Sequence, residues 1–154
     1  LLAGDIGGFG GVNFTPRVPV LKTLRIGSRQ IPGMGGTHHL FIQDWNNQIW
    51  EMGPRLAGGV WKNFLYQPSN AAGEQAIAAT QASLGDPSTL FTTTRVDQEK
   101  FAAAILSYRQ KWVGQRYRPL TFNSNYFVRY VINSAGGKIP TGVLGFTPSI
   151  TFRP

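Results

Sequence analysis

The sequence lacks several residues on which common protein functions depend. It contains no cysteine, which excludes disulfides, thiolate metal sites and a cysteine nucleophile for the chain as it stands. It has only two histidines, His38 and His39, and its seven acidic residues show no metal-ligand spacing. No apolar run approaches the ~20 residues that a membrane-spanning helix needs, and no signal-peptide pattern opens the chain. We therefore expect no metal, no cofactor and no transmembrane segment.

Glycine and proline, by contrast, are abundant. Nineteen glycines and ten prolines among 154 residues predict short elements joined by structured turns. The length suits one hydrophobic core and leaves little room for a second. We expect a Gly-rich arm over residues 1–16 and a single globular domain over residues 17–154.

Extended segments are predicted mainly in the first two-thirds of the chain. The clearest is a hairpin over residues 37–54, THHLFIQDWNNQIWEMGP, in which two apolar runs flank the turn residues DWNN. Further strands are expected over residues 17–27, 58–68 and 88–96. In the first of these, Pro19 indicates an edge strand, because proline cannot donate a backbone hydrogen bond to a neighbouring strand.

Three segments have helical patterns. The Ala-rich stretch of residues 70–85 is followed by a GDP turn. Asp97 is a suitable N-cap for the next helix, which Gly114 ends and whose apolar residues recur at helical spacing. The run TFNSNYFVRYVINSAGG, residues 121–137, predicts a helix with a capped start and a glycine stop. This order of elements predicts an α+β domain, with a small antiparallel sheet and two or three helices.

The balance of charge is strongly basic. Fifteen basic against seven acidic residues give a net charge of +8, which favours anionic partners such as nucleic acid, lipid headgroups or cell-wall polymers. The strongest candidate for such a contact is YRQKWVGQRYR, residues 108–118, which includes Arg116 and Arg118 and combines cations with stacking faces. The same segment suits an anionic membrane surface.

Ser124 lies at the start of the last predicted helix, between Asn123 and Asn125. Asn123 or Ser124 can cap the free backbone N–H groups there, which typically contributes ~1 kcal/mol. The same position suits a nucleophile, because the helix dipole and the unpaired N–H groups stabilise developing negative charge. A serine hydroxyl then needs a neighbouring base. The sequence is compatible with either role, a capping serine or a nucleophile.

The base for such a nucleophile would be a histidine, since only His38 and His39 titrate near neutrality without perturbation. Adjacent residues on a strand point to opposite faces, so at most one of the two faces a given pocket. Glu51, on the second strand of the hairpin among apolar neighbours, is the leading candidate for orienting the imidazole. The alternative is a strand-end carboxylate that reaches water or pairs with an arginine.

A histidine hairpin followed by a nucleophile helix resembles the circularly permuted papain-like superfamily, which includes lecithin:retinol acyltransferase-like proteins and cell-wall amidases. NSNYFV, residues 123–128, is similar to the N-C-E-H-F-V-like motif of that superfamily, with Ser124 at the position of the nucleophilic cysteine. The hairpin supplies the histidine strand, with His38 at the best-matching position and Glu51 near the orienting position. The hairpin and the last third of the chain also resemble toxin-like domains at the ends of large secreted bacterial proteins.

The resemblance implies a hydrolase or acyltransferase that attacks amide or ester carbonyls, with Ser124 as nucleophile, His38 as base and Glu51 as the orienting group. It implies a secreted bacterial effector or toxin that acts on a cell-wall peptide, a lipid or a protein, with an immunity or parent protein as a further partner. Binding contacts are expected from five other residues, Asn123, Asn125, His39, Arg116 and Arg118.

Serine at the cysteine position has three readings. Serine is far less reactive than a thiolate paired with histidine, so its presence here needs an explanation. The residue is a natural serine nucleophile, part of a silent site retained for binding, or a replacement of cysteine by engineering. The competing hypothesis is a catalytically silent basic module that binds nucleic acid, a membrane surface or a partner protein. The first residue, Leu1, is not methionine, which indicates a fragment or a processed product.

Overall fold

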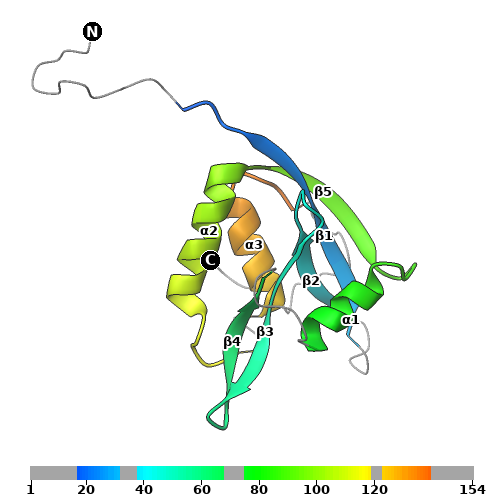
Figure 1. Ribbon diagram of the computed structural model, residues 1–154, viewed down its shortest axis with the longest axis vertical. Helices are drawn as coiled ribbons and strands as arrows, with labels where there is room; N and C mark the ends of the chain where they lie inside the picture. Colours follow the sequence, from blue (N-terminus) through cyan, green and yellow to red (C-terminus); the bar gives the residue numbers. More distant parts are fainter. Residues whose placement is uncertain (1–16, 32–37, 68–74, 119–122, 140–154) are drawn as a thin grey trace, which may run out of the picture.

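The computed structural model describes residues 17–31, 38–67, 75–118 and 123–139, and these form an α+β architecture (Figure 1). A five-stranded antiparallel sheet has the strand order β4-β3-β2-β1-β5. The strands are β1 (Leu21–Gln30), β2 (His38–Gln43), β3 (Ile49–Ala57), β4 (Val60–Tyr66) and β5 (Leu90–Asp97). The helices within the described ranges are α1 (Gln75–Ser83), α2 (Gln98–Trp112) and α3 (Ser124–Ser134).

The fold class and the order of elements agree with the sequence prediction. Four strands are followed by a helix, a strand and two helices, and the sheet is antiparallel as expected. The arm predicted over residues 1–16 lies outside the described residues.

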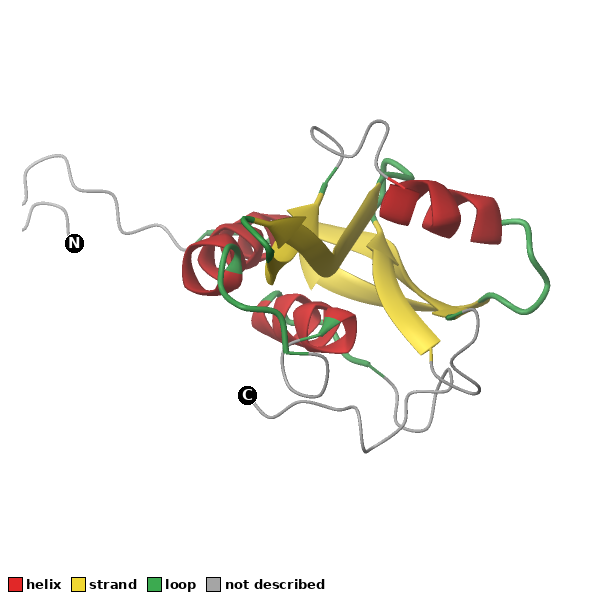
Figure 2. Cartoon of the chain, turned by 90° about the horizontal axis from the view of Figure 1, so that it is seen from below, coloured by secondary structure: helices red, strands yellow, loops and turns green. Residues whose placement is uncertain are grey.

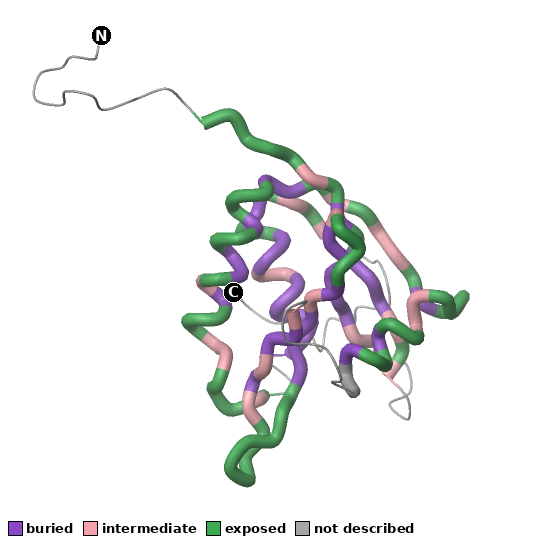
Figure 3. Tube along the Cα trace, in the orientation of Figure 1, coloured by how far each residue is buried: buried purple, intermediate pink, exposed green. Residues whose placement is uncertain are grey.

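The sheet has a helix layer on each of its two faces. Side chains alternate between the faces along each strand. Leu40, Ile42 and Met52 pack with α2 and α3 in the larger core cluster, whereas Phe41 and Ile77 pack together in a smaller cluster that joins the sheet to α1. Figure 2 shows α2 and α3 together, with the sheet between them and α1. The buried stretches follow the centre of the sheet and the inner side of α3 (Figure 3).

The strand β1 is not the edge strand that Pro19 indicated. It pairs with β2 on one side and with β5 on the other, so the edges of the sheet are β4 and β5. The strand begins only at Leu21, two residues after the proline. The missing N–H of Pro19 therefore lies outside the ladder, and the edge prediction is wrong for that reason.

The helix α2 starts as the sequence predicts. The Asp97 side chain is the N-cap and accepts the backbone N–H groups of Glu99 and Lys100. The Arg17 guanidinium lies against the same carboxylate, with Nη2 2.6 Å from Oδ2. This hydrogen bond with Arg17, with help from the two capped N–H groups, holds the pKa of Asp97 below its usual range.

We expect the stability of the wild type to decline more between pH 7 and pH 3 than that of Asp97→Asn. Because the native pKa of Asp97 lies below the unfolded value of ~3.9, the ionised carboxylate stabilises the fold above that value. The contribution is lost as the pH falls through the native pKa. Urea midpoints at the two pH values measure the difference. Arg17→Ala removes the main cause of the lowered pKa and should also flatten the dependence; equal losses in wild type and Asp97→Asn would contradict the prediction.

Candidate functional site

The first turn of α3 is capped by Asn123 rather than by Ser124. The side-chain oxygen of Asn123 accepts the backbone N–H of Tyr126 at 3.0 Å. Ser124 follows as the first residue of the helix and is 8% exposed. The capping role that the sequence left open between these two residues therefore belongs to Asn123, and the Ser124 hydroxyl is not used as the cap.

Asn125 connects this first turn to the sheet. Its Oδ1 accepts the backbone N–H of Leu40 at 3.2 Å and the hydroxyl of Ser124 at 3.3 Å. The two strands β2 and β3 pair only at Ile42↔Trp50 and Gln43↔Ile49. Further along β2, where no pairing with β3 remains, the N–H of Leu40 donates to the Asn125 side chain. The start of α3 thus occupies the place where β2 and β3 separate, and it holds the Ser124 hydroxyl there.

Glu51 pairs with His39. Its Oε2 lies 2.9 Å from His39 Nε2, and the two side chains are 1% and 11% exposed. The structure differs here from the sequence prediction, in which Glu51 orients the imidazole of His38. It also excludes the strand-end alternative in which Glu51 reaches water, because the carboxylate is buried in the sheet.

The second oxygen of Glu51 is held from α1. Oε1 accepts the hydroxyl of Thr80, and Thr80 Oγ1 in turn accepts Nε–H of Arg29 at 2.9 Å. Burial lowers the pKa of the Arg29 guanidinium, whereas the charge of Glu51 acts in the opposite direction and favours the charged form. The buried carboxylate therefore has hydrogen bonds to both oxygens and a cation nearby, which is the condition for keeping a charge inside a protein.

Strand alternation explains why His39 and not His38 meets Glu51. Counting outward from the observed pairs of β2 and β3 places Phe41 opposite Glu51, so odd-numbered residues of both strands share a face. His39 lies on that face, two residues from Phe41. His38 lies on the face of Leu40, against which α2 and α3 pack. The turn DWNN was predicted from the sequence, and it fixes which residues of the two strands lie opposite each other. Counting from this turn could therefore have identified His39 as the histidine on the face of Glu51.

Of the other predicted binding residues, Arg116 and Arg118 lie apart from this cluster. Arg116 forms an isolated bridge with Lys62 of β4 and lines a pocket beside Trp61 and Tyr117. The segment 108–118 is not one binding stripe, because Tyr108 is fully buried in the core. The sequence prediction therefore separates into two regions, the start of α3 and the outer side of β4.

The described residues contain neither a cluster of metal-ligating side chains nor a helix that could span a membrane. No group of three or more histidine, aspartate or glutamate side chains within these ranges is placed to hold a metal ion. None of their helices is both long enough and apolar enough to cross a bilayer. The structure thus brings together the imidazole of His39 and the carboxylate of Glu51, and it holds the Ser124 hydroxyl on Asn125, which accepts the N–H of Leu40, the residue after His39.

Comparison of the chain with protein-family models, with curated proteins and with solved structures finds no match.

Proposed function

We propose that the chain is a hydrolase or acyltransferase of permuted papain type that acts on amide or ester carbonyls. Ser124 is the nucleophile, His39 the base and Glu51 the group that orients the imidazole. The observation that carries the proposal is the shared oxygen of Asn125, which ties the Ser124 hydroxyl to the backbone of β2 next to His39. The natural setting we propose is a secreted bacterial effector with a cell-wall peptide, lipid or protein substrate.

The orientation of His39 suits the role of a base. Glu51 occupies Nε2 at 2.9 Å, which leaves Nδ1 as the nitrogen that accepts a proton. Because α3 packs on the other face of the sheet, the proposed step requires the imidazole to reach the Ser124 hydroxyl through the gap where β2 and β3 separate. In the acylation step Nδ1 then takes the proton of that hydroxyl while Oγ bonds to the substrate carbonyl carbon. The same proton then passes to the leaving amine or alcohol as its bond to carbon breaks. In the second step water attacks the acyl group and loses a proton to Nδ1. That proton returns to Oγ of Ser124 as the acyl group leaves.

The start of α3 supplies the complementary charge. The first N–H groups of a helix have no acceptor within the helix, and the helix dipole is positive at this end. The N–H of Tyr126 is used by the cap, so those of Ser124 and Asn125 are the donors for the carbonyl oxygen as it becomes negative. Such donors typically contribute about 10²-fold or more to the rate.

A fluorophosphonate probe, which labels activated serines, tests the assignment. Labelling is expected at Ser124, located by mass spectrometry of the digested protein, and Ser124→Ala should abolish it. His39→Gln should slow it by about 10²-fold or more. His38→Gln is the matched control, one residue away on the opposite face, and should leave the rate close to that of the wild type.

Stability has to be separated from reactivity in this experiment, because His39→Gln removes a partner from buried Glu51. Glu51→Gln keeps the shape of the side chain and should slow labelling without loss of the fold, as judged by near-UV circular dichroism. Absence of label on Ser124 in the folded wild type would overturn the proposal in favour of a silent binding module. Loss of labelling in His38→Gln but not in His39→Gln would overturn the choice of base.

A further inference from the structure

The tip of the β3–β4 hairpin exposes large apolar side chains. It covers residues 55–62, RLAGGVWK, in which Leu56 is 55%, Val60 40% and Trp61 55% exposed. The turn itself contains Gly58 and Gly59, both with positive φ, a backbone conformation that glycine adopts without strain. Three large apolar residues are therefore held together at one end of the molecule, around a tight turn.

The two segments that form and support this tip carry only positive charges. The ranges 52–67 and 108–118 together contain six lysines and arginines and no aspartate or glutamate. They are Arg55, Lys62, Arg109, Lys111, Arg116 and Arg118. The ion pairs of the described residues involve Arg17 and His39, and neither Lys62 nor Arg116 takes part in one. Arg55 and Lys62 thus lie within the tip and Arg116 lies against it, whereas Arg109 contacts Gln67 at the other end of β4.

The hairpin is fixed to the body of the protein by the segment that follows α2. Tyr117 N–H donates to the Trp61 carbonyl at 2.8 Å, and Asn63 N–H donates to the Gln115 carbonyl at 2.7 Å. These bonds cover the outer edge of β4 and bring Arg116 opposite Lys62. Apolar and cationic groups are therefore presented in one fixed arrangement.

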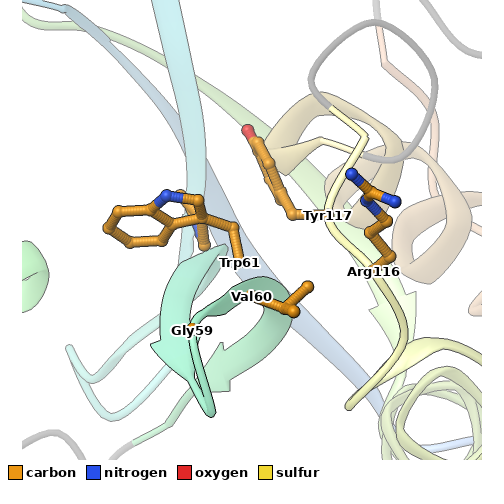
Figure 4. Close-up of a pocket in the computed structure, with 6 residues that line it drawn as sticks. Gly59, Val60, Trp61, Arg116 and Tyr117 are labelled. Atoms are coloured by element: carbon orange, nitrogen blue, oxygen red, sulfur yellow. The ribbon is translucent and has the colours of Figure 1, made fainter.

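The same arrangement encloses an open pocket of about 460 Å³. Figure 4 shows that Val60, Trp61, Tyr117 and Arg116 gather around it, above the turn that carries Gly59. Its lining combines two amphipathic rings with a guanidinium group. Indole and phenol rings are enriched where a protein meets the headgroup level of a bilayer, because one end is apolar and the other polar.

We propose that the tip of the β3–β4 hairpin docks on the surface of an anionic lipid bilayer. Leu56, Val60 and Trp61 enter the interface, while Lys62 and Arg116 contact the lipid phosphates and carboxylates. Exposed aliphatic side chains favour this partner over nucleic acid, which would be held by cations and stacking rings along a groove and offers no apolar surface to Leu56 or Val60. The local excess of positive charge favours an anionic over a neutral membrane.

Sedimentation with vesicles tests the proposal with the chain as it exists. The wild type is expected to bind vesicles of mixed phosphatidylserine and phosphatidylcholine, and to bind pure phosphatidylcholine far more weakly. Trp61→Ser and Arg116→Glu should each weaken binding to the anionic vesicles by roughly tenfold or more. Trp61→Ser should also lose the quenching of tryptophan fluorescence by brominated lipid, which a purely electrostatic contact would not produce.

Two matched variants on the opposite edge of the sheet serve as controls. Leu90→Ser and Arg95→Glu change an exposed leucine and an exposed arginine of β5, and both should bind as the wild type does. Equal weakening by Arg95→Glu and Arg116→Glu would overturn the proposal, since it would mean that net charge alone drives binding. Failure of the wild type to bind anionic vesicles would overturn it as well, even if the protein binds single-stranded DNA or RNA.

Discussion

Ser124→Cys is expected to carry a thiol that is ionised well below the ordinary thiol pKa of ~8.5. The chain contains no cysteine, so the introduced thiol is the only one in the protein. At the first residue of α3 the helix dipole favours the thiolate, and in the proposed site the thiol proton passes to His39. We expect a thiolate absorbance profile shifted down by about two pH units, and alkylation by iodoacetamide at pH 6 that is roughly tenfold or more faster than for an ordinary thiol.

The same helix provides the matched control. Ser134 is the last residue of α3 and is exposed, so Ser134→Cys places a thiol at the negative end of the same dipole. Its profile should lie at or above the ordinary value. Combining Ser124→Cys with His39→Gln should move the profile of the thiol back upward. Identical pH profiles for Ser124→Cys and Ser134→Cys would contradict the assignment of a nucleophile position at the start of α3.

Gly27→Ala is expected to destabilise the protein by about 3 kcal/mol, as overpacking of a filled core does. Gly27 is buried in β1, directly opposite Phe41 of β2, and a β-carbon there would overlap the end of the Phe41 ring. That ring is itself fully buried and lies edge-on to Phe91, with centroids 5.9 Å apart. It cannot move aside without disturbing the smaller core cluster. Urea unfolding of the purified variant gives the change in free energy.

A double-mutant cycle separates overlap from other effects of the substitution. Phe41→Ala alone should cost ~3–5 kcal/mol, but in that background Gly27→Ala should cost little, because the overlapping ring is gone. Gly85→Ala is the matched single control, since a β-carbon there would meet nothing within 4 Å. A similar loss of stability for Gly27→Ala with and without Phe41 would show that the ring is not the cause.

Much of the fold was predictable from local patterns. The cap at Asp97, the glycine turns and the alternation around DWNN are local signals, and each of them marks an element that the structure contains. Pro19 misled because proline restricts only its own backbone position, and the strand starts two residues later. The position of the start of β1, which differs by only a few residues from the predicted one, therefore decides whether Pro19 lies in the sheet.

The candidate site was predictable only in part, because its contacts depend on which layer covers which face. Ser124 and Glu51 were identifiable from their sequence context. Thr80 and Glu51 are separated by 29 positions in the chain, and Arg29 and Thr80 by 51 positions. Their hydrogen bonds form only because α1 covers that face of the sheet. The alternation along β2 selects His39, and this follows from the register of the hairpin rather than from any local motif.

The hydrogen bond from Leu40 to Asn125 also constrains the order in which the molecule is completed. It joins residues 85 positions apart, so the gap between β2 and β3 stays unfilled until the segment of α3 has left the ribosome. A nascent chain that lacks this segment has the imidazole and its carboxylate but neither the serine nor the amide that holds it in place. Contacts of such long range form late and slowly. The candidate site is therefore completed only after nearly the whole described domain has been synthesised.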